Sequence, residues 1–317
     1  MSLNDKEAIA SLRVLVCVAK ADGVLHDEEK KALTAAVEGA SLPGGTTLEA
    51  LLSEKGDLAA QLAALESPEA REQTYHSAYA MAWADGECSP AEDKMLETIR
   101  EKLGISAEKK GLLQRVFRET KDTVLLSNIE PVKDAKKRDA EIREDTLKYS
   151  VLSAVLGAFP VPGLAIATDL AVVALQVKLV RDIGQYWGHK VDRQGAKSIL
   201  YGLGLGTGAR MAVNNLAKLI PGWGSAVGAA TSFASTWALG KVMNRFFADG
   251  KTAADAATLR GAFKEAEKEG KTAFRDQKDA IVAKERENRD ALEALNEKLK
   301  AGEIDQAEFE KRAAELA

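Results

Sequence analysis

Acidic side chains gather at two Asp-Gly steps in the first third of this 317-residue chain. The six carboxylates concerned are Asp22, Glu28, Glu29, Asp85, Glu92 and Asp93. An Asp-Gly step followed six residues later by Glu matches the second half of an EF-hand loop, in which carboxylates bind Ca²⁺. The first half is absent, because Val18 and Lys20 in one copy, and Met81 and Trp83 in the other, stand where the first ligands belong. The carboxylates therefore either bind a divalent cation (Ca²⁺, Mg²⁺ or Zn²⁺) in another way or serve only the turn.

Both acidic steps belong to an internal repeat with a period of 63 residues. Residues 18–25 recur as residues 81–88, and Glu29 and Leu33 recur as Glu92 and Leu96. Each copy predicts a helix, a tight turn and a second helix. The run Ser89-Pro90-Ala91-Glu92 is typical of a capping box with proline in the first helical position, so a helix is predicted to begin there.

The Ala-Asp-Gly step, the acidic helix start and the duplicated helical hairpin resemble the TerB-like family, which is named for tellurite resistance. The resemblance covers residues 1–119. It implies a compact helical bundle with an acidic surface site for a divalent metal, and it carries over to the six carboxylates named above. No nucleophile with an adjacent general base accompanies them, so we predict that the chain is not an enzyme.

Composition favours helices throughout the chain. Hydrophobic residues make up 46% and aromatic residues only 5%, so the cores must consist mainly of Ala, Leu and Val. The predicted fold is all-α: an N-terminal helical bundle, a central Gly/Ala-rich helical hairpin domain and a long charged C-terminal helix. A net charge of -4 gives no reason to expect nucleic-acid binding. Two cysteines, Cys17 and Cys88, exclude a disulfide framework, and a polar N-terminus without a signal region favours the cytoplasm.

Two nearly uncharged segments, residues 151–177 and 219–240, are long enough to span a bilayer. Their small residues and Pro-Gly breaks make insertion weak, whereas spaced glycines allow close helix contact. The residues predicted to serve membrane contact or helix packing are Pro162, Gly163, Gly202, Gly204, Gly206, Gly208, Pro221, Gly222, Gly224 and Gly228. A two-span anchor, a soluble Ala/Gly bundle and a conditional insertion all fit these residues, and we favour conditional insertion.

A second resemblance covers residues 149–250. The motifs at 157–163, 183–188 and 220–224 are similar to the YcjF-like, GTPase-associated family of domains. That resemblance implies association with the bacterial inner membrane, either peripheral or integral, no catalysis and a possible GTPase partner. Aromatic and basic residues at the segment ends also suit a membrane interface.

Charged helices flank this domain on both sides. Residues 120–148 predict a solvated connector whose basic run, Lys133, Lys136, Lys137 and Arg138, could contact lipid headgroups. Residues 251–317 predict a helical arm, and residues 299–309 resemble a short C-terminal oligomerisation motif. A glycine-capped helical hairpin explains the same residues.

The sequence as a whole therefore predicts a non-enzymatic, membrane-associating scaffold or stress-response protein. Its N-terminal domain would sense a divalent metal, and the chain would form a homo-oligomer. The alternative is a soluble helical adaptor for a GTPase or a stress-response complex.

Overall fold

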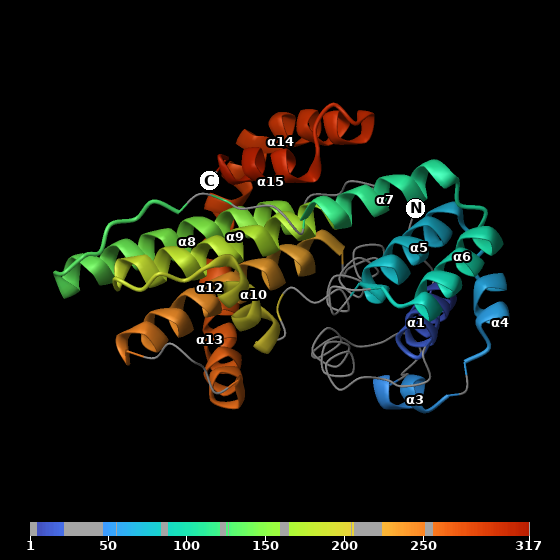
Figure 1. Ribbon diagram of the computed structural model, residues 1–317, viewed down its shortest axis with the longest axis horizontal. Helices are drawn as coiled ribbons and strands as arrows, with labels where there is room; N and C mark the ends of the chain where they lie inside the picture. The colour runs from blue at the N-terminus through green and yellow to red at the C-terminus, as the bar shows by residue number, and fades with distance from the viewer. Residues whose placement is uncertain are drawn as a thin grey trace. The chain divides into compact units, whose positions relative to one another are not determined.

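The computed structural model describes residues 5–21, 47–54, 56–83, 88–120, 125, 127–158, 165–203, 205, 224–250 and 256–316. Every regular element within these residues is a helix (Figure 1). The predicted all-α fold is therefore confirmed. The described residues form two compact units. The first holds those up to residue 115 together with residues 165, 166 and 224, and the second holds those within 116–158, 167–205 and 225–316.

The first unit is built around two paired helices. Its helices are α1 (Asp5–Ala19), α3 (Leu48–Ser53), α4 (Leu58–Ala63), α5 (Pro68–Ala82), α6 (Pro90–Leu103) and most of α7 (Ala107–Thr120). Glu7 near the start of α1 accepts hydrogen bonds from the backbone N–H groups of Glu66 and Ser67, at 2.9 and 2.7 Å, just before α5. Farther along, the hydroxyls of Ser11 and Thr74 are 2.7 Å apart. The two helices therefore run parallel.

Residues 48–65 form two short helices, α3 and α4. The break lies between Ser53 and Leu58, where Asp57 caps α4 by accepting a hydrogen bond from the N–H of Ala60. A side chain that caps a helix start competes with continuation of the preceding helix. Leu51 and Leu62, one from each short helix, are both buried, so the break still allows both to join the core.

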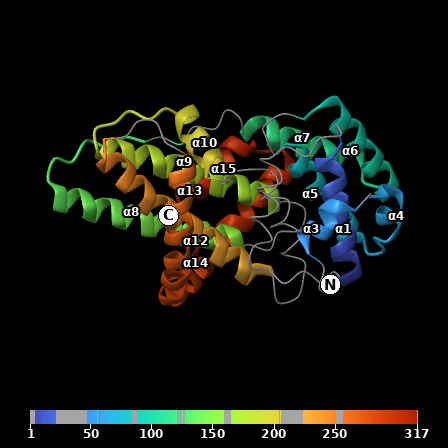
Figure 2. The ribbon, with the colours of Figure 1, turned by 90° about the horizontal axis from the view of Figure 1, so that it is seen from below.

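The second unit is a bundle of longer helices. They are α8 (Ala135–Ala158), α9 (Ala165–Tyr186), α10 (Arg193–Gly202), α12 (Gly224–Ala248), α13 (Ala256–Asp276), α14 (Lys278–Ala301) and α15 (Gln306–Ala314). α8 continues past Lys148, which the sequence placed at the end of a separate connector. Figures 1 and 2 both show α8 and α9 side by side.

Small residues let the helices of the second unit approach closely. A Cβ atom added to Gly157 of α8 would lie 2.8 Å from the carbonyl oxygen of Gly228 in α12. A Cβ added to Gly270 of α13 would lie 2.9 Å from the backbone of Ala234 in α12. These distances are shorter than side-chain packing permits, so the glycines set how near the helix axes come.

The described part of the C-terminal arm forms three helices, α13, α14 and α15, where one long helix was predicted. α13 and α14 are separated only by Gln277, and α14 ends at Gly302 in the left-handed conformation, with φ of 74°. Asp305 then caps α15, accepting a hydrogen bond from the N–H of Glu308. α14 packs against both α8 and α15, so its apolar stripe is covered within the unit.

The apolar segments lie mostly inside the second unit. Their described part includes α9 and α12, which are buried around most of their circumference, as expected for helices that are apolar on all sides. Among the residues that the structure describes, no helix combines the length and hydropathy that a membrane crossing requires. The aromatic residues Tyr186, Phe246 and Phe247 at the helix ends are buried as well.

Candidate functional site

The two copies of the internal repeat, which are 63 residues apart, contact each other through equivalent positions. Ser11 and Thr74, which bond to each other, are 63 positions apart. The last residues of α1 and α5, Ala19 and Ala82, are separated by the same interval. Because these helices run parallel and in contact, they end on the same side of the first unit. One copy of the acidic Asp-Gly segment follows each of these two helix ends in the sequence.

Two of the six predicted metal ligands fall within the described residues. Glu92 and Asp93 lie in the first turn of α6. The carboxylate of Glu92 accepts a hydrogen bond from the N–H of Ser89 at 2.8 Å, and the hydroxyl of Ser89 accepts one from the N–H of Glu92 at 3.2 Å. This is the predicted capping box, which is confirmed. One oxygen of Glu92 is thus committed to the helix cap, whereas Asp93 is exposed to solvent.

The other four predicted ligands lie outside the described residues, namely Asp22, Glu28, Glu29 and Asp85. Within the part of the chain that the structure covers, no three His, Cys, Asp or Glu side chains come close enough to hold a metal ion. A metal site at this end of the first unit would therefore have to draw on the acidic segments that follow α1 and α5.

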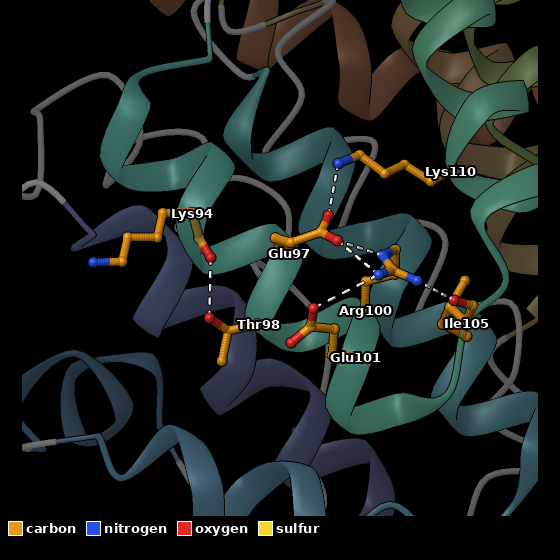
Figure 3. Close-up of polar contacts among 7 residues, drawn as sticks. All are labelled: Lys94, Glu97, Thr98, Arg100, Glu101, Ile105 and Lys110. Atoms are coloured by element: carbon orange, nitrogen blue, oxygen red, sulfur yellow. Dashed lines mark hydrogen bonds and ion pairs between the residues drawn. The ribbon is translucent and has the colours of Figure 1, made fainter.

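An ion-pair network fixes α6 to α7, one turn beyond Asp93 (Figure 3). Glu97 accepts hydrogen bonds from Arg100 at 2.7 and 2.9 Å and from Lys110 at 2.6 Å. These two donors lower the pKa of Glu97 to about 2. Arg100 also donates to the carbonyl oxygen of Ile105 at 3.0 Å. The network positions the helix that carries Glu92 and Asp93, and the contact of Glu97 with Lys110 of α7 could not be predicted from local sequence.

A buried histidine lies on α5 in the first unit. His76 on α5 is 3% exposed, and its Nε2 is 4.0 Å from Glu72, which is paired with Lys109 of α7. Burial lowers the pKa of His76 to about 4, against the opposing effect of Glu72. The side chain is therefore neutral at pH 7, and its burial favours a structural role over acid–base work near neutrality.

A buried ionic cluster joins α8 and α9 in the second unit. Asp182, with no exposed surface, is paired with Lys178 at 2.6 Å and accepts hydrogen bonds from the hydroxyls of Tyr149 and Ser127. Beside it, Tyr186 donates to Asp145 at 2.9 Å. Burial raises the pKa of Asp145, and the nearby charge of Asp182 adds to this shift.

Sequence reasoning missed this cluster. The only signal was the i, i+4 spacing of Lys178 and Asp182, which is common on solvated helices. The burial of Asp182 and its contacts with Ser127 and Tyr149 depend on how distant segments pack.

The predicted packing residues within the described part of the chain lie at helix ends and contacts. Gly202 ends α10, and its carbonyl oxygen accepts a hydrogen bond from Arg260 of α13 at 2.6 Å. Gly224 begins α12, and Gly228 lies against Gly157 of α8. The remaining predicted positions are outside the described residues, namely Pro162, Gly163, Gly204, Gly206, Gly208, Pro221 and Gly222.

Comparison with known proteins finds one family that is similar to the first unit. Residues 8–114 match the family model of the tellurite resistance protein TerB. No curated protein matches the chain, and no solved structure does. The resemblances at residues 149–250 and 299–309 stay predictions. The match spans the paired helices, the capping box and both acidic segments, so residues 8–114 are similar to TerB, and we call this part of the chain the TerB domain.

Proposed function

We propose that this protein is a non-enzymatic stress-response scaffold whose TerB domain binds a divalent cation. The observation that carries the proposal is the parallel pairing of α1 and α5, which end on the same side of the domain 63 residues apart. Each helix end is followed by an acidic Asp-Gly segment.

Electrostatics supports a cation at this end. A carboxylate just after a helix C-terminus meets the negative end of the helix dipole, which is unfavourable by about 0.3–1 kcal/mol. Two such segments at neighbouring helix ends add mutual repulsion, which a bound divalent cation would offset. The cation would be Ca²⁺, Mg²⁺ or Zn²⁺, with oxygen ligands favouring the first two.

Calorimetric titration tests this proposal. Ca²⁺, Mg²⁺ and Zn²⁺ are added separately to the wild type, to Asp22→Asn/Asp85→Asn and to the control Asp276→Asn, which removes an exposed carboxylate from the second unit. We expect binding by the wild type and the control and its loss in the double variant. If the wild type binds none of the three cations, the proposal is contradicted and the acidic turns have a purely structural role.

The second unit would act as the docking body of the scaffold. Its large apolar side chains are covered by neighbouring helices, and within the described residues only Tyr201 and Val282 are large hydrophobics with substantial exposure, at 38% and 37%. This burial favours an adaptor that binds a protein, such as a GTPase or another member of a stress-response complex, through polar surface.

Peripheral membrane contact is a second candidate function. Lys133, Lys136 and Lys137 are all exposed at the start of α8, whereas Arg138 is stacked on Trp187, with 3.6 Å between its Cζ and the ring centroid. Three free lysines at one helix end can attract anionic headgroups with about 1 kcal/mol per residue. This contact needs no insertion of apolar helices.

Vesicle flotation separates the two candidates. Phosphatidylglycerol-containing and purely phosphatidylcholine vesicles are mixed with wild type, with Lys133→Gln/Lys136→Gln/Lys137→Gln, and with the charge-matched control Lys264→Gln/Lys268→Gln/Lys271→Gln on α13. Membrane contact predicts flotation of the wild type and the control on anionic vesicles only, and its loss in the α8 variant. If the wild type stays at the bottom of the gradient with both vesicle types, membrane contact is contradicted and the adaptor is the function that remains.

Self-association through the C-terminal arm belongs to the same proposal. α14 and α15 form a short hairpin capped by Gly302 and Asp305, with exposed charged residues on its outer face. Light scattering behind a sizing column measures the mass of the full chain. A mass of 33.9 kDa at every concentration would identify a monomer and contradict self-association.

A further inference from the structure

A hollow of about 230 Å³ opens between α12 and α13 in the second unit. The two helices are in close contact near Gly270 and Ala234, and the hollow lies farther along the pair, toward the end of α12. Its lining residues are Lys241, Val242 and Arg245 of α12, and Gly261, Ala262, Glu265, Ala266 and Glu269 of α13. This volume is below the range typical of drug-sized ligands and fits a small metabolite.

Gly261 keeps this hollow open. A glycine in the interior of a helix is destabilising relative to alanine, so its presence there calls for a reason. A Cβ atom added to Gly261 would meet no atom within 4 Å, and the residue does not adopt a positive φ. Neither helix contact nor a turn therefore requires glycine at this position, in contrast to Gly270 of the same helix. What the missing side chain provides is space in the hollow.

Opposite charges line the two walls of the hollow. Lys241 and Glu269 form an ion pair across it. One turn away, Arg245 and Glu265 lie on opposite walls, but Glu265 pairs with Lys268 of its own helix at 2.8 Å, in an exposed pair that is easily exchanged for another partner. Within the described part of the chain, the guanidinium of Arg245 has no hydrogen-bond or ion-pair partner. A free guanidinium and a weakly held carboxylate thus border the same space.

The floor between these charges is apolar. Val242 and Ala266 are 2% and 7% exposed, and Ala262 is half-buried beside them. A guanidinium binds a carboxylate through two parallel hydrogen bonds, and a carboxylate accepts hydrogen bonds from an ammonium group. An apolar floor favours an aliphatic side chain. The three parts of the hollow therefore match the three parts of an aliphatic α-amino acid.

We propose that the hollow between α12 and α13 is a binding site for a small aliphatic amino acid in its zwitterionic form. Arg245 binds the α-carboxylate, Glu265 binds the ammonium group, and the ligand occupies the space that Gly261 leaves. The inference goes beyond the cation site of the TerB domain and the scaffold function, and it depends on neither.

Ligand-detected NMR titration of the full chain with L-valine tests this site. Two analogues each lack one charge of valine: isovalerate has no ammonium group, and isobutylamine has no carboxylate. We expect saturable binding of valine and at least about tenfold weaker binding of each analogue, as loss of a hydrogen bond between charged groups implies. If isovalerate or isobutylamine binds as tightly as valine, the proposed recognition of both charges is overturned.

Two substitutions assign the binding to the hollow. Arg245→Met removes the carboxylate donor, and Gly261→Leu fills the space, so each should weaken valine binding at least about tenfold. Gly261→Leu should not lower the midpoint of urea denaturation, because leucine favours a helix more than glycine does. Loss of binding in this variant would therefore not reflect unfolding.

The matched controls are Arg275→Met, at an exposed position of α13, and Gly111→Leu on α7, where an added Cβ also meets no atom within 4 Å. Both should bind valine as the wild type does. The proposal is overturned if the folded wild type shows no saturable binding at millimolar valine. It is equally overturned if Arg245→Met or Gly261→Leu binds valine as tightly as the wild type.

Discussion

α5 in the TerB domain and α9 in the second unit are both buried around most of their circumference, and each carries a titratable side chain. On α5, His76 has no cation or carboxylate in close hydrogen-bonded contact, and burial keeps it neutral. On α9, Asp182 is paired with Lys178 and is bonded by two hydroxyls. A buried titratable side chain without close charged partners is accommodated in its neutral form. A buried side chain that keeps its charge requires partners from several segments.

The two units also space their helices differently. In the TerB domain, α1 and α5 meet through a side-chain contact between Ser11 and Thr74. In the second unit, Gly157 and Gly270 bring backbones into near contact. Close spacing leaves little room for water between α12 and its neighbours α8 and α13.

The largest expected effect comes from breaking the ion pair of the buried Asp182 on α9. Lys178→Met leaves Asp182 buried without its cation and should lower the free energy of unfolding of the second unit by about 3–5 kcal/mol. Adding Asp182→Leu should restore most of this loss, because it removes the stranded charge. Urea denaturation measures both. Arg13→Met, which breaks the exposed pair with Glu54 in the TerB domain, serves as control and should cost less than about 1 kcal/mol. Equal losses for the two single variants would contradict the contrast between buried and exposed pairs.

The neutral histidine on α5 predicts a pH dependence. The pKa of His76 falls from an ordinary 6.5 to about 4 in the folded chain, so the unfolded chain binds more protons between these values. Stability of the TerB domain should therefore fall as pH drops from about 6.5 to 4, by about 3 kcal/mol in all.

Thermal unfolding of the wild type and His76→Gln over this pH range measures that slope. The variant should lose this contribution. Glu72→Gln should extend the slope to lower pH, because Glu72 raises the pKa of His76. If the slope of stability against pH is unchanged in His76→Gln, other groups cause the acid sensitivity.

Two glycines on α13 test the role of close helix spacing. Gly270→Ala places a Cβ atom 2.9 Å from the backbone of Ala234, which cannot rotate away, and should destabilise the second unit by about 1–2 kcal/mol. Gly261→Ala meets no atom within 4 Å and should stabilise it by up to about 1 kcal/mol through helix propensity. The midpoint of chemical denaturation should therefore shift in opposite directions in the two variants. A shift of the same sign in both would contradict a role for backbone contact at Gly270.

The smallest expected effect is at the capping box of α6. Ser89→Ala removes the hydroxyl that accepts from the N–H of Glu92 and should cost the TerB domain about 1 kcal/mol. Glu92→Gln keeps an acceptor for the N–H of Ser89 and should be nearly neutral. A large loss of stability in Glu92→Gln would mean that the carboxylate charge itself is needed there.

Local sequence was sufficient for several features of this protein. The capping box at Ser89 could be predicted because each of its bonds spans three residues. The TerB domain was recognisable from its repeated Asp-Gly step, and the scarcity of aromatic and β-branched runs pointed to helices. These signals depend on neighbours in the chain, which is why they survive without a structure.

Tertiary structure alone decided how these helices use their side chains. The sequence shows Lys178 and Asp182 one turn apart, but only packing brings Ser127 and Tyr149 to that carboxylate and removes it from water. The apolar segments likewise look able to span a bilayer, because the sequence gives their hydropathy but not whether lipid or other helices surround them. In the folded chain, other helices of the same unit cover the described part of these segments, since spaced glycines let the helices approach closely enough to exclude water.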